Sequence, residues 1–132
     1  MSRKVVIVPC SGIGKTFGTV SREAAYTVVE DLRPEKADLV ALSLLVLGDE
    51  GARAAVAGHP TITIDGCRLA CATKMVQESG LPVARSFTVL DAFRKHRDLK
   101  PEGISSLNPE GQQLARVLAE EVAEAVDGLR EE

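Results

Sequence analysis

The sequence predicts a single α/β domain in which helices cover both faces of a mainly parallel sheet of about four strands, a three-layer, Rossmann-like arrangement. The chain has 132 residues, which fits one domain over residues 1–132 and is long enough to bury a core. Apolar residues make up 45% of it but aromatic residues only 3%, so Val, Leu, Ile and Ala must build the core. Short apolar runs alternate with helical patterns, which predicts βαβ units with right-handed crossovers.

Two strands and two helices are predicted in the first half of the chain. Residues 4–9 (KVVIVP) form a continuous apolar run, as expected of a strand buried on both faces. Apolar residues at four-residue steps predict a helix within 19–33. A second buried strand is predicted over 38–47 (DLVALSLLVL), followed by a short helix over 49–58 that Asp49 could cap.

The second half is predicted to contain two more strands and two more helices. Residues 61–65 (TITID) are rich in β-branched side chains and predict a strand, and a helix is expected over 67–79. A fourth strand is expected over 83–90, and 91–108 is predicted to be mainly loop. An apolar stripe predicts an amphipathic C-terminal helix at about 110–129. We expect this helix to cover a sheet face; a contact in a homodimer is the alternative.

Charge and hydropathy exclude several classes of partner. Residues 110–132 carry seven acidic residues against two basic ones, which argues against nucleic-acid binding because that requires a basic face. The longest apolar run, 39–47, is far shorter than the roughly 20 residues of a membrane span, and no secretion signal is recognisable at the N-terminus. We therefore expect a cytoplasmic protein without membrane contact. In that reducing compartment its three cysteines are expected to be metal ligands, nucleophiles or packing residues.

Residues 5–16 (VVIVPCSGIGKT) resemble a phosphate-binding P-loop. Such a loop needs a glycine four residues before its Gly-Lys-Thr unit, and this position is Pro9, which has no backbone N–H to donate. A nucleotide hydrolase is therefore disfavoured. The turn could still hold a small anion through Ser11, Gly12, Gly14 and Lys15. Alternatively, its glycines only permit a tight turn.

The cysteines point to a different chemistry. Cys10 ends the first predicted strand, and Cys67 follows the strand 61–65 by two residues. If these strands are parallel neighbours, both thiols lie at the carboxyl edge of the sheet. If a helix begins near Cys67, Cys71 lies on the same helix face, about 6 Å along the axis. Three converging thiols predict a metal site, with zinc as the expected ion.

The identity of a fourth ligand stays open. Asp65 could complete the site, although we favour a role as the cap of the following helix. Met75 carries a thioether that suits zinc poorly, and His59 precedes the strand 61–65 whereas Cys67 follows it. His96 lies in a basic segment whose position the pattern does not define.

Three stretches together resemble a known family. They are PCSGIGKTFGTVSREAAY (9–26), LLVLGDE (44–50) and IDGCRLACATKM (64–75), and they are similar to the DGC-domain family, which is named for the motif formed here by residues 65–67. The resemblance spans most of 4–100. It implies a small α/β domain without a well-defined reaction. By position, the implied zinc ligands are Cys10, Cys67 and Cys71.

This chain departs from the family pattern in one respect. The family is described with four cysteines, and the fourth in some relatives falls near Met75 of this three-cysteine chain. A closed site of four thiolates is therefore in doubt, and an open fourth position is expected.

Three functions remain as hypotheses. The first is a zinc-binding protein of undefined biochemical role. The second is a small enzyme that acts on an anionic substrate, using either zinc-activated water or a reactive Cys10 that Cys67 or Cys71 resolves. The third is an iron–sulfur protein, or a module that binds an unidentified partner through its acidic C-terminal helix.

Overall fold

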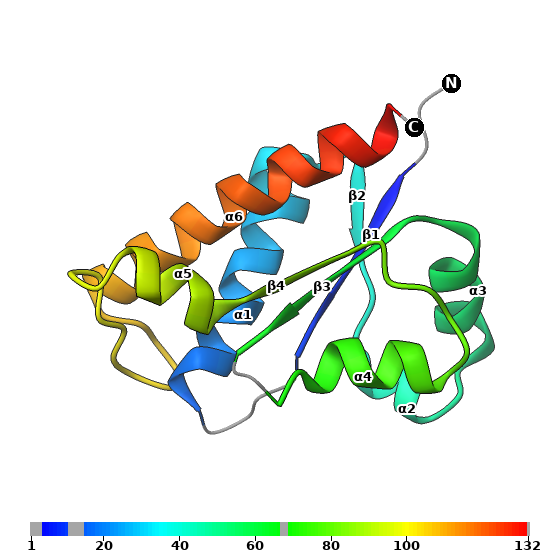
Figure 1. The fold of residues 1–132 in the computed structure, drawn as a ribbon, viewed down its shortest axis with the longest axis horizontal. Coiled ribbons are helices and arrows are strands. Elements are labelled where there is room, and N and C mark those ends of the chain that lie inside the picture. The colour runs from blue at the N-terminus through cyan, green and yellow to red at the C-terminus, as the bar shows by residue number, and fades with distance from the viewer. Residues whose placement is uncertain (1–3, 11–14, 67–68, 132) are drawn as a thin grey trace.

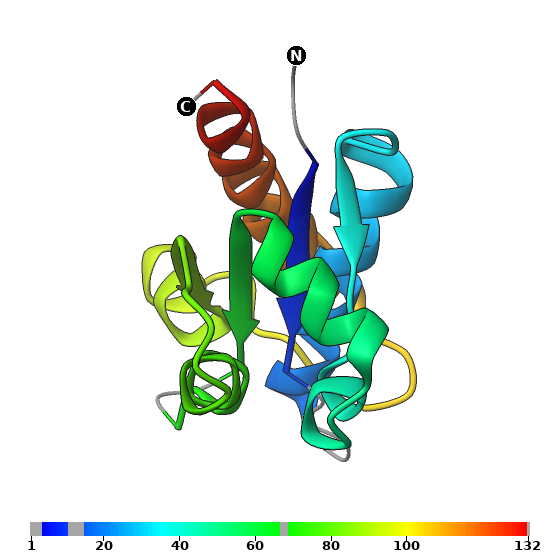
Figure 2. The same cartoon turned by 90° about the vertical axis from the view of Figure 1, so that its right-hand side faces the viewer.

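A parallel four-stranded sheet forms the centre of the molecule and confirms the predicted α/β class. The structure is a computed structural model that describes residues 4–10, 15–66 and 69–131. The strands are β1 (Val5–Pro9), β2 (Ala37–Leu39), β3 (Thr61–Asp65) and β4 (Arg85–Thr88). They lie in the order β2-β1-β3-β4, and every neighbouring pair is parallel. Figures 1 and 2 show helices on both faces of this sheet.

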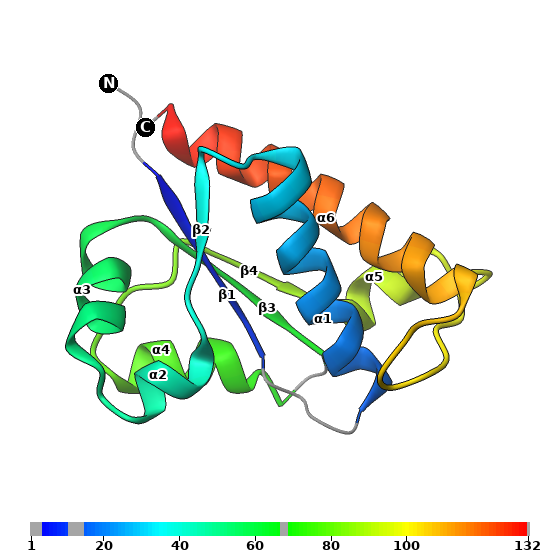
Figure 3. The same ribbon diagram turned by 180° about the vertical axis from the view of Figure 1, so that it is seen from behind.

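The alternation of side chains along β1 divides the core into two layers. Val5 and Ile7 pack on one face, and Val6 and Val8 pack on the other. The first face is covered by α1 (Thr16–Tyr26), the π-helical segment η1 (Thr27–Leu32), α5 (Val89–Lys95) and α6 (Pro109–Arg130). The second face is covered by α2 (Leu42–Val46), α3 (Glu50–Gly58) and α4 (Cys71–Glu78). Figure 3 shows both groups of helices from behind.

The longest helix, α6, runs across α1 and the sheet. Asn108 caps it by accepting a hydrogen bond from the backbone N–H of Gly111, and Pro109 occupies its first turn. Its apolar stripe is buried and consists of Leu114, Leu118, Val122, Val126 and Leu129 with smaller residues between them. Among the described residues, no helix is both long enough and apolar enough to cross a membrane.

Three predicted elements are wrong in extent or type. The strand expected over 38–47 ends at Leu39, and residues 42–46 form the helix α2, in which Leu42 and Leu45 are buried at helical spacing. The strand expected over 83–90 is shorter, because Thr88 caps α5 inside a region expected to be mainly loop. The helix expected over 67–79 begins only at Cys71.

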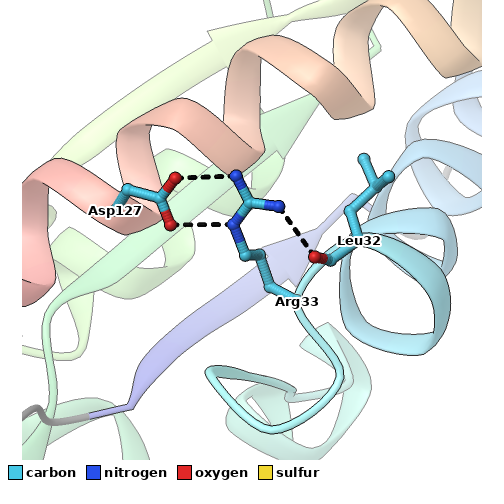
Figure 4. Close-up of polar contacts among 3 residues, drawn as sticks. All are labelled: Leu32, Arg33 and Asp127. Atoms are coloured by element: carbon cyan, nitrogen blue, oxygen red, sulfur yellow. Dashed lines mark hydrogen bonds and ion pairs between the residues drawn. The ribbon is translucent and has the colours of Figure 1, made fainter.

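An ion pair joins Arg33, the residue after η1, to α6 (Figure 4). Arg33 donates from Nε and from a terminal nitrogen to the two carboxylate oxygens of Asp127, each at 2.7 Å, and its other terminal nitrogen donates to the Leu32 carbonyl. These hydrogen bonds are the main reason that the pKa of Arg33 is raised and the pKa of Asp127 is lowered from their ordinary values. Two parallel hydrogen bonds from one guanidinium to one carboxylate are the strong geometry for an Arg–Asp ion pair.

Replacing Asp127 by Asn is expected to lower the free energy of unfolding at neutral pH by less than about 1 kcal/mol, because the carboxylate is 45% exposed. A carboxyl with a lowered folded pKa adds stability above its unfolded pKa and loses it as the pH falls through the folded value. The difference between Asp127→Asn and wild type should therefore shrink as the pH falls to about 2 in urea unfolding. The exposed Asp31→Asn is the control. An Asp127→Asn deficit that persists undiminished in acid would contradict this assignment.

Candidate metal-binding site

The candidate site lies where β1 and β3 end. The chain leaves β1 for β2 on one side and returns to β3 on the other, so the carboxyl ends of β1 and β3 flank the switch point of the sheet. Open α/β sheets bind their ligands at this place. Pro9 pairs with Ile64, so these strands are parallel neighbours, which is the condition for the common edge expected from the sequence. In Figure 1 the first turns of α1 and α4 lie near the ends of β1 and β3.

Cys10 is held at this edge from two sides. Its backbone N–H donates to the carbonyl of Ile64 at 2.8 Å, which continues the β1–β3 ladder by one residue. Its Sγ accepts a hydrogen bond from the backbone N–H of Gly66 at 3.3 Å and lies 3.2 Å from the Oγ of Ser21 on α1. The side chain is buried, with 6% exposure of the residue. The Cys10 sulfur therefore touches the backbone of the residue that immediately precedes Cys67 in the chain.

A side chain at Gly66 would crowd the backbone of α1. A Cβ on Gly66 would lie 3.1 Å from the carbonyl carbon of Phe17 and 3.2 Å from the backbone nitrogen of Gly18. Both are backbone atoms of the first turn of α1, so they could yield only if the helix moved. The close approach of α1 therefore favours glycine at the middle position of the Asp-Gly-Cys motif.

Asp65 caps α4. It is 1% exposed, and its Oδ1 accepts a hydrogen bond from the backbone N–H of Ala72 at 2.7 Å. Its Oδ2 accepts from the hydroxyl of Thr73 at 2.7 Å and from the backbone N–H of Thr73 at 3.3 Å. The Thr73 hydroxyl is also 2.6 Å from that of Thr63, so the carboxylate belongs to a buried network. All three hydrogen bonds that its oxygens accept come from the first turn of α4.

Cys71 is the first residue of α4 and is exposed. Ala70 precedes it with a φ of 51°, and no other non-glycine residue in the described part of the chain has a positive φ. This left-handed backbone costs roughly 1–2 kcal/mol for a residue with a Cβ. Strain of this kind tends to occur at functional sites. Here it turns the chain into α4 directly before a candidate ligand.

The remaining candidates are only partly placed. Cys67, Ser11, Gly12 and Gly14 lie outside the described residues. Lys15 is exposed and immediately precedes α1. Because α4 begins at Cys71, the expectation that one helix begins near Cys67 and carries both thiols on one face is wrong. Within residues 4–10, 15–66 and 69–131, no group of three or more His, Cys, Asp or Glu side chains could hold a metal ion.

Neither histidine belongs to a group of three or more possible metal ligands among the described residues. His59 precedes β3, and its Nδ1 is 2.9 Å from the carbonyl of Ala55. His96 follows α5.

Sequence reasoning missed two polar residues of this edge, Ser21 and Thr73. Ser21 is fully buried, and it precedes the apolar residues Ala24, Ala25 and Val28 by three, four and seven positions. A serine on the apolar face of a helix is the signal that could have identified it. Thr73 is only half-buried and carried no comparable signal.

Comparison of the sequence with models of known protein families identifies the family of this chain. The model for the DGC domain matches residues 6–110, which is about four-fifths of the chain. The chain belongs to the DGC-domain family. No match was found among curated proteins or among solved structures. In this DGC domain the matched region contains all three cysteines and ends in the first turn of α6, so most of that helix lies beyond the match.

Proposed function

We propose that this DGC domain binds one zinc ion through the thiolates of Cys10, Cys67 and Cys71 at the carboxyl edge of its sheet. The observation that carries the proposal is the hydrogen bond from the Gly66 N–H to the Cys10 sulfur. It joins the first cysteine to the Asp-Gly-Cys motif across 56 residues of sequence, at the switch point of the sheet. Thiolate sulfur is a preferred ligand of zinc.

Two of the three proposed ligands, Cys10 and Cys71, are among the described residues. Cys10 presents a buried sulfur that already accepts a backbone hydrogen bond, as metal-bound sulfurs commonly do. Cys71 is free and exposed at the start of α4, next to the strained Ala70. Both flank the Asp65 network, one at the end of β1 and the other at the start of α4.

The fourth position is proposed to stay open to exchangeable ligands. The oxygens of Asp65 already accept three hydrogen bonds from the start of α4, which argues against their use as metal ligands. Three protein ligands and one open position characterise zinc sites that act on bound water or substrate, and zinc in such a site acidifies its water. This arrangement supports a role in which the protein transfers, senses or uses the ion, and we propose that it does so in the cytoplasm. The burial of Cys10 argues against its action as a metal-free nucleophile.

Protein purified without added metal is expected to contain about one zinc per chain by elemental analysis, and Cys67→Ser should lose most of it. Met75→Leu is the matched control, because Met75 is the sulfur-containing residue of α4 that is not a proposed ligand, and its replacement should keep the zinc. Full retention of zinc by Cys67→Ser would refute the ligand assignment. A brown protein with visible absorption would show an iron–sulfur cluster in place of zinc.

A further inference from the structure

The contacts of the Cys10 sulfur single out Ser21, a residue to which no role has yet been given. Ser21 is on the buried face of α1 and has 0% exposure. Its Oγ donates a hydrogen bond to the carbonyl of Gly18 at 2.7 Å and lies 3.2 Å from the sulfur of Cys10. The Gly66 N–H reaches the same sulfur from β3. The sulfur is thus enclosed by one polar group from α1 and one from the end of β3.

The donors and acceptors of this contact can be assigned. A serine hydroxyl has one proton, and a carbonyl oxygen can only accept, so the Ser21 proton points to Gly18. The Cys10 thiol then donates its own proton to the Ser21 oxygen while its sulfur accepts from Gly66. Both hydrogen bonds define the direction of the Cys10 side chain before any metal is bound.

Zinc bound to Cys10 would reverse one of these hydrogen bonds. Cysteine binds zinc as a thiolate, which has no proton and can only accept. Rotation of the Ser21 hydroxyl would turn its proton from the Gly18 carbonyl to the sulfur, and α-helical geometry provides that carbonyl with another donor four residues later. The thiolate would then accept two hydrogen bonds, from Gly66 and Ser21. Because both side chains are buried, water is a poor substitute for the lost hydroxyl in an alanine variant.

We propose that Ser21 is the positioning residue of the Cys10 ligand: its hydroxyl orients the thiol in the metal-free protein and donates to the thiolate in the zinc-bound protein. This inference rests on the proposed function, because it assigns Cys10 as a ligand. Residues that hydrogen-bond to metal ligands typically change metal affinity by 10–100-fold when they are replaced.

Ser21→Ala is expected to bind zinc about 10-fold more weakly than wild type in a competition titration. Alanine is the better helix former, so the variant should fold. In the cobalt(II)-substituted protein, loss of a hydrogen bond to the thiolate should move the sulfur-to-cobalt charge-transfer band to longer wavelength. A purely structural role would not shift this band. Ser21→Thr, which keeps the hydroxyl, should restore the band and the affinity.

Thr61→Val is the matched control. It removes a different buried hydroxyl, at the amino end of β3 and away from the site, and should leave affinity and spectrum unchanged. Wild-type affinity and an unshifted band in Ser21→Ala would overturn the inference while the zinc assignment stands. Absence of metal from wild type would overturn the proposed function.

One measurement tests Ser21 without metal. Scalar couplings of Cys10 in the metal-free protein should show one side-chain rotamer in wild type and averaging in Ser21→Ala. The same single rotamer in both proteins would also overturn the inference.

Discussion

Removal of residues 109–132 is expected to unfold the domain. This truncation deletes α6, which contributes five large apolar side chains to the core that covers one sheet face. Burial of one such side chain stabilises a protein by about 1.5–3 kcal/mol, so the five together contribute about 7–15 kcal/mol. The net stability of a whole domain is about 5–15 kcal/mol. Circular dichroism and amide NMR spectra of the truncated chain should therefore be those of an unfolded protein.

Two point variants on α6 separate loss of packing from loss of charge. Leu118→Ala, at a position with 1% exposure, should lower the free energy of unfolding by about 2–5 kcal/mol. Glu120→Ala, on the exposed face of the same helix, should change it by less than about 0.5 kcal/mol. A truncated chain that stayed folded would contradict this result. It would instead support the hypothesis that the acidic helix is an arm for docking a partner.

Asp65→Ala is expected to lower the free energy of unfolding by about 2–4 kcal/mol at neutral pH. The carboxyl group is buried, and its removal leaves two backbone N–H groups at the start of α4 without their acceptor. Asp65→Asn keeps the shape, but an amide nitrogen then faces a hydrogen-bond donor, so this variant should also be strongly destabilised. Chemical denaturation of each variant measures the effect.

Asp49→Ala is the matched control for Asp65. Asp49 caps α3 through one hydrogen bond to the Ala52 N–H, but the residue is exposed, so its loss should cost about 1 kcal/mol. Equal losses in Asp49→Ala and Asp65→Ala would mean that burial of the Asp65 network adds no stability. That result would remove the reason for excluding Asp65 as a metal ligand.

The sheet could be predicted well from local sequence. The runs 4–9 and 61–65 are continuous and β-branched, and β1 and β3 match them within one residue. The βαβ pattern predicted a parallel sheet with right-handed crossovers but left open whether β1 and β3 are neighbours. The fold class was therefore accessible without knowledge of any long-range contact.

The run 38–47 could not be assigned correctly from its own residues. A continuous apolar run is equally consistent with a buried strand and with a short helix, and tertiary contacts decide between them. The structure buries Leu42 and Leu45 and leaves Leu47 80% exposed, a distribution that apolarity alone does not predict. The predicted start of α4 was too early for a related reason. Ala70 has a left-handed backbone, which is usually signalled in a sequence by glycine, and here that position is an alanine.

The edge of the candidate site was predictable, but its detailed contacts were not. The positions of Cys10 and of the Asp-Gly-Cys motif after two parallel strands indicate a common edge, and the described residues agree with it. The need for glycine at position 66 depends on the path of α1, which the sequence does not display. The approach of the Ser21 hydroxyl to the Cys10 sulfur depends on the path of the same helix. Long-range packing therefore determines the finer part of the site.

The close packing of Gly66 against α1 also has a kinetic consequence. Gly66 lies so near the first turn of α1 that an added Cβ would crowd it, and its N–H donates to the sulfur of Cys10, so we expect a fluctuation that lifts this turn to loosen the sulfur as well. An ion bound to this sulfur would exchange no faster than the first turn of α1 opens. Hydrogen exchange at the start of α1 and the off-rate of the ion should then vary together.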